Sequence, residues 1–185
     1  MRFFQRRYQE NTTLLNICKY VADVCIVIVL AYVLVTFLCC RSTVAGNSME
    51  ETLSNNNTVL INRISYAFDG PKRFDCIAFQ QDSVNSSKIY IKRVIGLPGE
   101  TIQIKDGKVY INDSQLDDYV DTLILAPGSA ANQYKLGSDE YFVLGDNRNN
   151  SEDSRFASVG MVKRSNIVGK VWMVIEPFNS LGFVK

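Results

Sequence analysis

The chain has 185 residues, of which 46% are hydrophobic and 21% charged, and its formal net charge is +1. This composition suits one folded domain of ordinary size and excludes a disordered, collagen-like or coiled-coil chain. The lack of excess positive charge argues against a nucleic-acid partner. The chain contains no histidine, which excludes a Ser-His-Asp or Cys-His catalytic group and any zinc site with a histidine ligand.

An apolar segment close to the N-terminus predicts a membrane anchor. Val24–Cys40 contains no charged residue, and with the two apolar residues before Asp23 it is long enough as a helix to cross about 30 Å of hydrocarbon. A cleavable signal peptide has a shorter apolar region that ends in small residues. The lack of a polar stripe disfavours a helix packed on a soluble domain. We therefore expect a retained transmembrane helix over residues 23–40.

The charges that flank this segment predict its orientation. Four lysines and arginines precede it, whereas only Arg41 follows it closely. Because basic residues are concentrated on the cytoplasmic side of membrane spans, residues 1–22 are expected in the cytoplasm and residues 41–185 outside. The sequence therefore predicts a single-pass protein with the lipid bilayer as one partner and an extracytoplasmic domain.

The part of the chain after residue 41 predicts a β-rich domain. Its apolar runs are short, rich in β-branched and aromatic residues and separated by turn residues, and none has a long helical period. Asp106-Gly107 stands between two alternating runs, which is a strong signal for a β-hairpin. The expected strands are Thr58–Asn62, Cys76–Phe79, Lys88–Ile91, Ile102–Lys105, Lys108–Ile111, Tyr141–Leu144 and Val168–Val174.

The remaining residue types predict no metal and no cofactor. Four of the five cysteines lie in or beside the apolar segment, and no pair has the Cys-x-x-Cys spacing; Cys76 is interpreted as a small buried hydrophobe. Asp117, Asp118 and Asp121 lack the spacing and the glycine of a calcium loop, so we interpret them as a solvated acidic loop.

Without histidine, a hydrolase would need another general base. A lysine serves when burial lowers its pKa, and Lys92 lies in the apolar run Tyr90–Gly99. Ser48 is a candidate nucleophile eight residues after Cys40, which keeps it within about 26–29 Å of the anchor. Taken separately, each residue has a plainer interpretation, as a lysine on a solvated strand face and as a loop serine.

Three segments taken together resemble the bacterial type I signal peptidases. They are Gly46–Met49, Tyr90–Gly99 and the polar segment Gly145–Arg155, and their order, the single anchor and the hairpin agree with the family. The eukaryotic members of the family, found in the endoplasmic reticulum, have histidine where this chain has Lys92, so the resemblance is to the bacterial branch. It implies a mainly β fold, with one N-terminal transmembrane helix followed by an all-β signal-peptidase-like catalytic domain that carries a small hairpin-rich subdomain.

The resemblance also implies a role for each matching residue. Ser48 would be the nucleophile, Lys92 the general base, and Ser151 would hydrogen-bond Lys92 and orient it. Asp153 and Arg155 would brace the site. Arg93 would pair with Asp146, and backbone N–H groups, including that of Ser48, would hold the oxyanion. The shallow pockets for small substrate side chains would be lined by Val44, Met49, Leu53 and Ile91.

Two positions depart from the family pattern. The family commonly has proline where this chain has Glu51, a change expected to loosen the loop after Ser48. Some members also have a serine that helps to bind the oxyanion where this chain has Gly46.

The implied function is that of a serine endopeptidase anchored in a bacterial cell membrane. Its partners would be the signal peptides of exported preproteins, which it would remove by cutting after small residues in an A-x-A pattern. Two alternatives remain open from the sequence. One is a peptidase of the same chemistry dedicated to a single secreted or pilus-type substrate, and the other is a non-catalytic membrane-anchored module that binds peptides.

Overall fold

The computed structural model describes residues 12–81 and 88–184, and the chain divides into two units after Phe37. The first unit contains nearly all of helix α1, Thr12–Leu38, whose side chains from residue 13 to residue 33 are all exposed. Within it, Thr13–Val33 has a mean hydropathy of 2.1 and the length to cross a membrane. The helix therefore includes residues before the predicted span. Cys39 and Cys40, predicted to end the anchor, belong instead to a strand.

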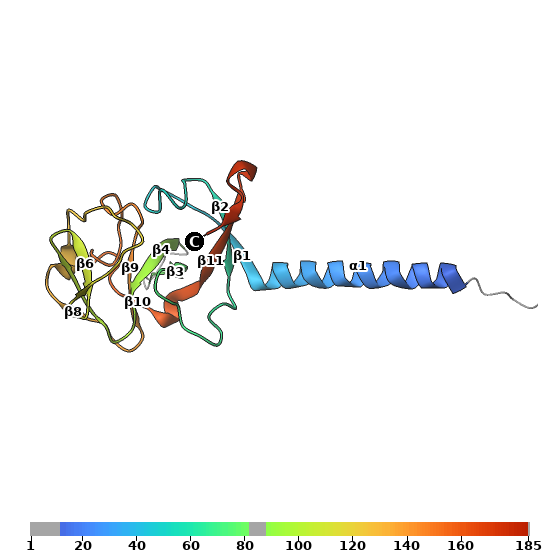
Figure 1. Cartoon of the computed structure of the whole chain (residues 1–185), viewed down its shortest axis with the longest axis horizontal. Helices are drawn as coiled ribbons and strands as arrows, with labels where there is room; N and C mark the ends of the chain where they lie inside the picture. The colour runs from blue at the N-terminus through green and yellow to red at the C-terminus, as the bar shows by residue number, and fades with distance from the viewer. Residues whose placement is uncertain (1–11, 82–87, 185) are drawn as a thin grey trace, which may run out of the picture. The chain divides into compact units, whose positions relative to one another are not determined.

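The second unit contains a large antiparallel sheet, labelled in Figure 1. Its strands run in the order β1-β2-β11-β3-β4-β9-β10, and β12 pairs with β11. β4 lies between β3 and β9, so both of its edges are hydrogen-bonded over part of its length. The strands are β1 (Cys39–Thr43), β2 (Thr58–Asn62), β3 (Cys76–Gln80), β4 (Ile89–Gly96), β9 (Glu140–Leu144), β10 (Val162–Lys163), β11 (Ile167–Glu176) and β12 (Gly182–Phe183).

A smaller sheet packs against β9 and the end of β4 (Figure 1). Its centre is the predicted hairpin, in which Asp106 and Gly107 have φ angles of 50° and 76°, as a two-residue type I′ turn requires. The strand order is β7-β6-β5-β8, which gives the hairpin-rich subdomain expected from the sequence. Its strands are β5 (Thr101–Lys105), β6 (Lys108–Ile111), β7 (Ser114–Gln115) and β8 (Tyr134–Lys135).

After Leu38, the described part of the chain contains no α-helix. Three short 3-10 helices connect the strands, so the prediction of a mainly β domain after one N-terminal helix is confirmed. They are η1 (Gly128–Ala131), η2 (Arg164–Asn166) and η3 (Phe178–Ser180).

β4 contributes to all three clusters of the hydrophobic core. Ile91 packs with the β1–β2 loop, Val94 packs on the opposite face, and Ile95 packs against the smaller sheet. Burying each such side chain contributes about 1.5–3 kcal/mol to folding, so the position of β4 is strongly determined. Lys92 and Arg93, which lie between these anchors, are consequently held in the interior.

Candidate active site

The loop between β1 and β2 carries Ser48 on a hydrogen-bonded turn. Val44 N–H donates to Asn57 O at 2.8 Å and closes the base of the loop. Met49 and Leu53 are fully buried on one side of the turn, and Leu53 N–H donates to Met49 O at 2.7 Å. Because these two side chains are fixed in the core, Ser48 is held half-buried at the surface of the sheet.

Lys92 lies directly against this serine. Its Nζ atom donates to Ser48 Oγ over 2.6 Å, and the residue is only 4% exposed. Burial lowers the pKa of Lys92, while the negative charges of neighbours, Asp153 above all, act in the opposite direction. A buried amine beside a hydroxyl is an arrangement in which the amine can accept the hydroxyl proton.

The polar segment Gly145–Arg155, here called the catalytic loop, is held by buried charges. Asp153 is fully buried, and its carboxylate accepts bonds from Gly145 N–H at 3.0 Å and from the Arg155 guanidinium at 2.7 and 2.8 Å. Asn147 N–H donates to Ser48 O at 3.1 Å. The loop is therefore tied to the turn that carries the serine as well as to the end of β9.

A second buried ion pair lies behind the lysine. Arg93 donates from Nε and NH2 to the two carboxylate oxygens of Asp146, at 2.7 and 2.6 Å, and both residues are at most 2% exposed. Thr52 Oγ1 also donates to Asp146, at 2.6 Å. The pair links β4 to the catalytic loop and to the turn after Ser48, and no sequence motif pointed to Thr52.

Ser151 differs from the expectation that it hydrogen-bonds Lys92. Its Oγ atom is buried and has no hydrogen-bond partner among the residues that the structure describes. The side chain lies against Gly145, close to where a β-carbon would stand. Because the Ser151 side chain packs against the backbone of Gly145, its Oγ atom does not bond to the lysine amine.

A groove of about 400 Å³ runs past Ser48 and Lys92. Val44, Met49 and Ile91 line it as expected, but Leu53 does not, because it is fully buried in the core cluster behind them. Asn150, Glu152 and Lys88 also line the groove. The sequence had not singled these out, although Asn150 and Glu152 flank Ser151 in the same polar segment.

Two strand edges border this groove. β1 is the end strand of its sheet, and residues 42–44 line the groove. β4 pairs with β3 from Ile89 onward, whereas its pairing with β9 begins only at Arg93. The backbone of residues 89–92 therefore presents an edge on the groove side, which suits an extended peptide.

The two other predictions for polar residues have different outcomes. Cys76 is 2% exposed, and burial raises the pKa of its thiol to about 12. Both observations agree with its interpretation as a small buried hydrophobe. Asp118, however, is not part of a solvated loop, because its carboxylate forms an ion pair with the buried Arg148. In the described residues, no group of three or more acidic or cysteine side chains is placed to hold a metal ion.

The loop after Ser48 is not loosened by Glu51. Thr52 and Leu53 both donate to Met49 O, and Glu51 adopts a φ of 85°. Proline is confined to a φ near −65°, so this turn has a backbone conformation that the expected proline cannot adopt. Gly46 similarly has a φ of 92°, which glycine adopts without strain and serine does not.

This conformation predicts opposite effects for two substitutions of Glu51. Glu51→Gly is expected to raise the free energy of unfolding by about 0.5–1 kcal/mol, because glycine adopts a positive φ without steric cost. Glu51→Pro is expected to lower it by about 2–3 kcal/mol. Thermal unfolding of the purified full-length chain measures both, and a stabilising proline would show that the turn has another conformation.

The sequence pattern of the family described as "Signal peptidase, peptidase S26" matches residues 17–176. A signal peptidase I of Leptolyngbya laminosa is 39% identical over 162 residues, which cover 84% of this chain and 77% of the relative. Signal peptidase I S of Bacillus subtilis strain 168 is 32% identical over 178 residues, covering 90% and 92%. The crystal structure of a signal peptidase I from Enterococcus faecalis V583 matches with a TM-score of 0.42 and 34% identity, covering 56% of this chain and 97% of that one.

Proposed function

The chain belongs to the signal peptidase family, peptidase S26, and is a serine peptidase that removes signal peptides. From this premise we propose that Ser48 is the nucleophile and that Lys92 is the general base. The observation that carries this proposal is the distance of 2.6 Å between Lys92 Nζ and Ser48 Oγ, with the lysine buried. A non-catalytic module has no need of a desolvated amine beside a hydroxyl, since burying the amine is costly.

In the proposed reaction, neutral Lys92 takes the proton of Ser48 as Oγ attacks the carbonyl carbon of the scissile bond. The oxyanion is held by backbone N–H groups, including that of Ser48. Gly46 N–H donates to Asn55 Oδ1 at 3.0 Å, so it is already engaged. Protonated Lys92 then gives its proton to the leaving amine and is neutral again. In the second half, neutral Lys92 takes a proton from the water that attacks the acyl-enzyme, and it returns this proton to Ser48 Oγ as the acyl group leaves.

The charged residues around the dyad are assigned a structural role. Arg155 bonds Asp153 through two nitrogens inside the protein, and this buried ion pair braces the catalytic loop. We assign Arg93 and Asp146 a similar role, since their buried ion pair joins β4 to the catalytic loop. The Asp153 carboxylate favours the ammonium form of Lys92, and burial of the amine is the larger influence and acts against it.

The proposed substrate is an extended peptide that lies in the groove with small side chains near the cut. The edges of β1 and β4 would form main-chain hydrogen bonds with it. Val44, Met49 and Ile91 are buried residues that line the groove, and in this proposal they form the shallow pockets for the small side chains one and three positions before the scissile bond.

The proposed setting is a bacterial cell membrane. Helix α1 is the anchor, as its apolar stretch Thr13–Val33 allows. The excess of basic residues before the span supports an N-terminus in the cytoplasm and a catalytic domain outside. The stretch Thr13–Val33 would then replace residues 23–40 as the anchor, and the extracytoplasmic domain would begin at Cys39, the first residue of β1.

Cleavage of a synthetic precursor tests the proposed substrate class. The full-length chain in detergent is expected to cut a precursor with alanine one and three positions before the cleavage site. Leucine at either position is expected to lower kcat/KM by about 100-fold, because the proposed pockets accept only small side chains. Equal cleavage of the leucine precursor would refute the A-x-A preference. Depletion in cells separates a general enzyme, which leaves many uncleaved precursors, from a dedicated one, which leaves one or two.

A further inference from the structure

Residues 118–126 form a segment without regular secondary structure, here called the clasp, between β7 and η1 of the smaller sheet. It lies against the catalytic loop, away from the groove. Asn149 donates through Nδ2 to Leu123 O at 3.0 Å and accepts through Oδ1 from Leu125 N–H at 2.9 Å. Arg155 NH1 donates to Ala126 O at 3.2 Å. The smaller sheet therefore holds the loop that carries the supporting residues of the site.

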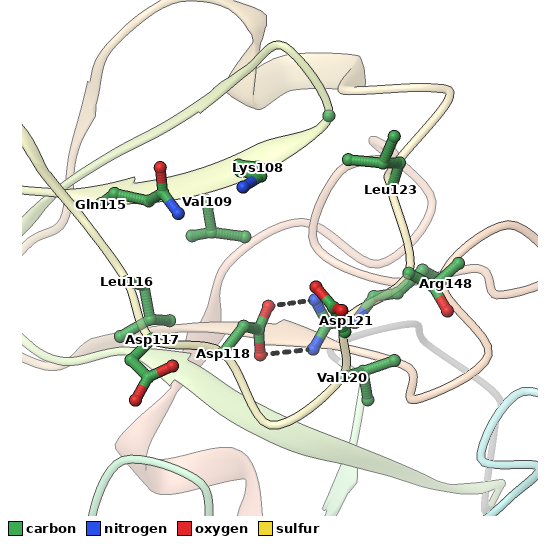
Figure 2. Close-up of a pocket in the computed structure, with 12 residues that line it drawn as sticks. Lys108, Val109, Gln115, Leu116, Asp117, Asp118, Val120, Asp121, Leu123 and Arg148 are labelled. Carbon is green, nitrogen blue, oxygen red and sulfur yellow. Dashed lines mark hydrogen bonds and ion pairs between the residues drawn. The ribbon is translucent and has the colours of Figure 1, made fainter.

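The strongest of these contacts is the ion pair between Asp118 and Arg148. Figure 2 shows the two side chains facing each other, joined by two parallel bonds between the guanidinium and the carboxylate. Arg148 is 1% exposed, so Asp118 supplies the charge that allows it to remain inside. The carbonyl oxygen of Arg148 accepts from Arg155 NH2 at 2.6 Å. Asp118 is thereby connected, through Arg148 and Arg155, to the carboxylate of Asp153.

Tyr119, the next residue of the clasp, contacts Arg93 of β4. The Tyr119 ring lies over the Arg93 guanidinium, 4.0 Å from ring centroid to Cζ. Arg93 is fully buried beneath it, whereas Tyr119 is 47% exposed. The ring shields this cation from water and attracts it through its π face. Arg93 directly follows Lys92 in β4, so the orientation of its side chain is coupled to that of the strand.

We propose that Asp118 and Tyr119 are positioning residues for the reaction, Asp118 acting through Arg148 on the catalytic loop and Tyr119 acting through Arg93 on β4. This inference rests on the proposed function of Ser48 and Lys92. Neither residue is among those that line the groove. Their contribution is therefore to the geometry of the dyad during the chemical step and not to substrate binding.

This division predicts that substitutions in the clasp change kcat and leave KM unchanged. Tyr119→Leu is expected to lower kcat about threefold to tenfold in cleavage of the alanine precursor by the full-length chain. Tyr119→Phe keeps the ring and is expected to retain wild-type kcat. Tyr134→Leu is the matched control, because Tyr134 is a 36% exposed tyrosine in β8 of the smaller sheet. It is expected to change neither constant.

Asp118→Asn is the corresponding test of the ion pair, since alanine would leave buried Arg148 without a partner and endanger folding. It is expected to lower kcat about tenfold at unchanged KM, and Asp117→Asn, at an exposed neighbour, is the control. Wild-type kcat in both Tyr119→Leu and Asp118→Asn, or a loss confined to KM, would overturn the inference. Ser48→Ala, assayed in parallel, tests the dyad separately, because its expected loss of activity does not depend on the results for the clasp variants.

Discussion

The Lys92→Met protein is expected to cleave a preprotein at least about 100-fold and up to about 10⁴-fold more slowly than the wild type, because methionine fills the space of lysine and cannot accept a proton. Ser48→Ala is expected to lose roughly 10⁴-fold or more, since it has no nucleophile. Lys92→Met is also expected not to lower the melting temperature, because burial already disfavours the ionised amine that it removes. Loss of activity with retained stability separates a catalytic role from a structural one.

The same assignment determines the direction of the pH dependence. The base must be neutral, and kcat therefore rises with pH as Lys92 loses its proton. Because burial lowers the pKa of Lys92 from its ordinary value of 10.5, the rise is expected to level off at a lower pH than an exposed lysine would give. Full activity at pH 5, or near-normal cleavage by Lys92→Met, would contradict a lysine base.

Gly145→Ala is expected to damage the site although neither member of the dyad is substituted. A β-carbon at this position would overlap Ser151 Oγ and the carbonyl oxygen of Ser48. Backbone atoms and a buried side chain cannot move aside cheaply, so the cost in stability is about 1–3 kcal/mol. Displacing Ser48 from Lys92 by an ångström would lower kcat about 100-fold. Urea unfolding and cleavage of the alanine precursor measure the two effects.

Gly160→Ala is the control for that substitution. Gly160 has a φ of 63° and nothing within 4 Å of its added β-carbon, so alanine there meets backbone strain but no neighbour. It is expected to cost about 1 kcal/mol and to leave kcat unchanged. Equal kcat for Gly145→Ala and the wild type would show that Ser48 tolerates displacement of its backbone.

Local patterns were sufficient for much of the fold. The run Thr58–Asn62 coincides with β2, and the Asp106-Gly107 turn joins β5 and β6. These elements depend on alternation and turn chemistry over a few neighbouring residues, which the sequence displays directly. The two-residue strands β7, β8, β10 and β12 were not predicted. They are too short to carry a pattern and exist because a neighbouring strand offers a partner.

The arrangement of side chains within the site was harder to predict from the sequence. The sequence identified Ser48 and Lys92 as candidates through the segments around them, and these two side chains lie in hydrogen-bond contact. The sequence predicted a hydrogen bond from Ser151 to Lys92 that is not formed. It also predicted that Leu53 lines the groove, whereas Leu53 is buried in the core behind it. Both errors concern which way a side chain points, which depends on the path of a loop and not on residue identity.

By itself, the amino-acid sequence determined that this protein has an apolar N-terminal helix and a β domain, and that without histidine it can have no histidine-based chemistry. Only the tertiary structure decided that Asp118 pairs with Arg148, that Tyr119 covers Arg93 and that Thr52 supports Asp146. The physical reason is that such contacts join segments far apart in the chain. Their partners are selected by strand register and core packing, which arise only when the whole domain has folded.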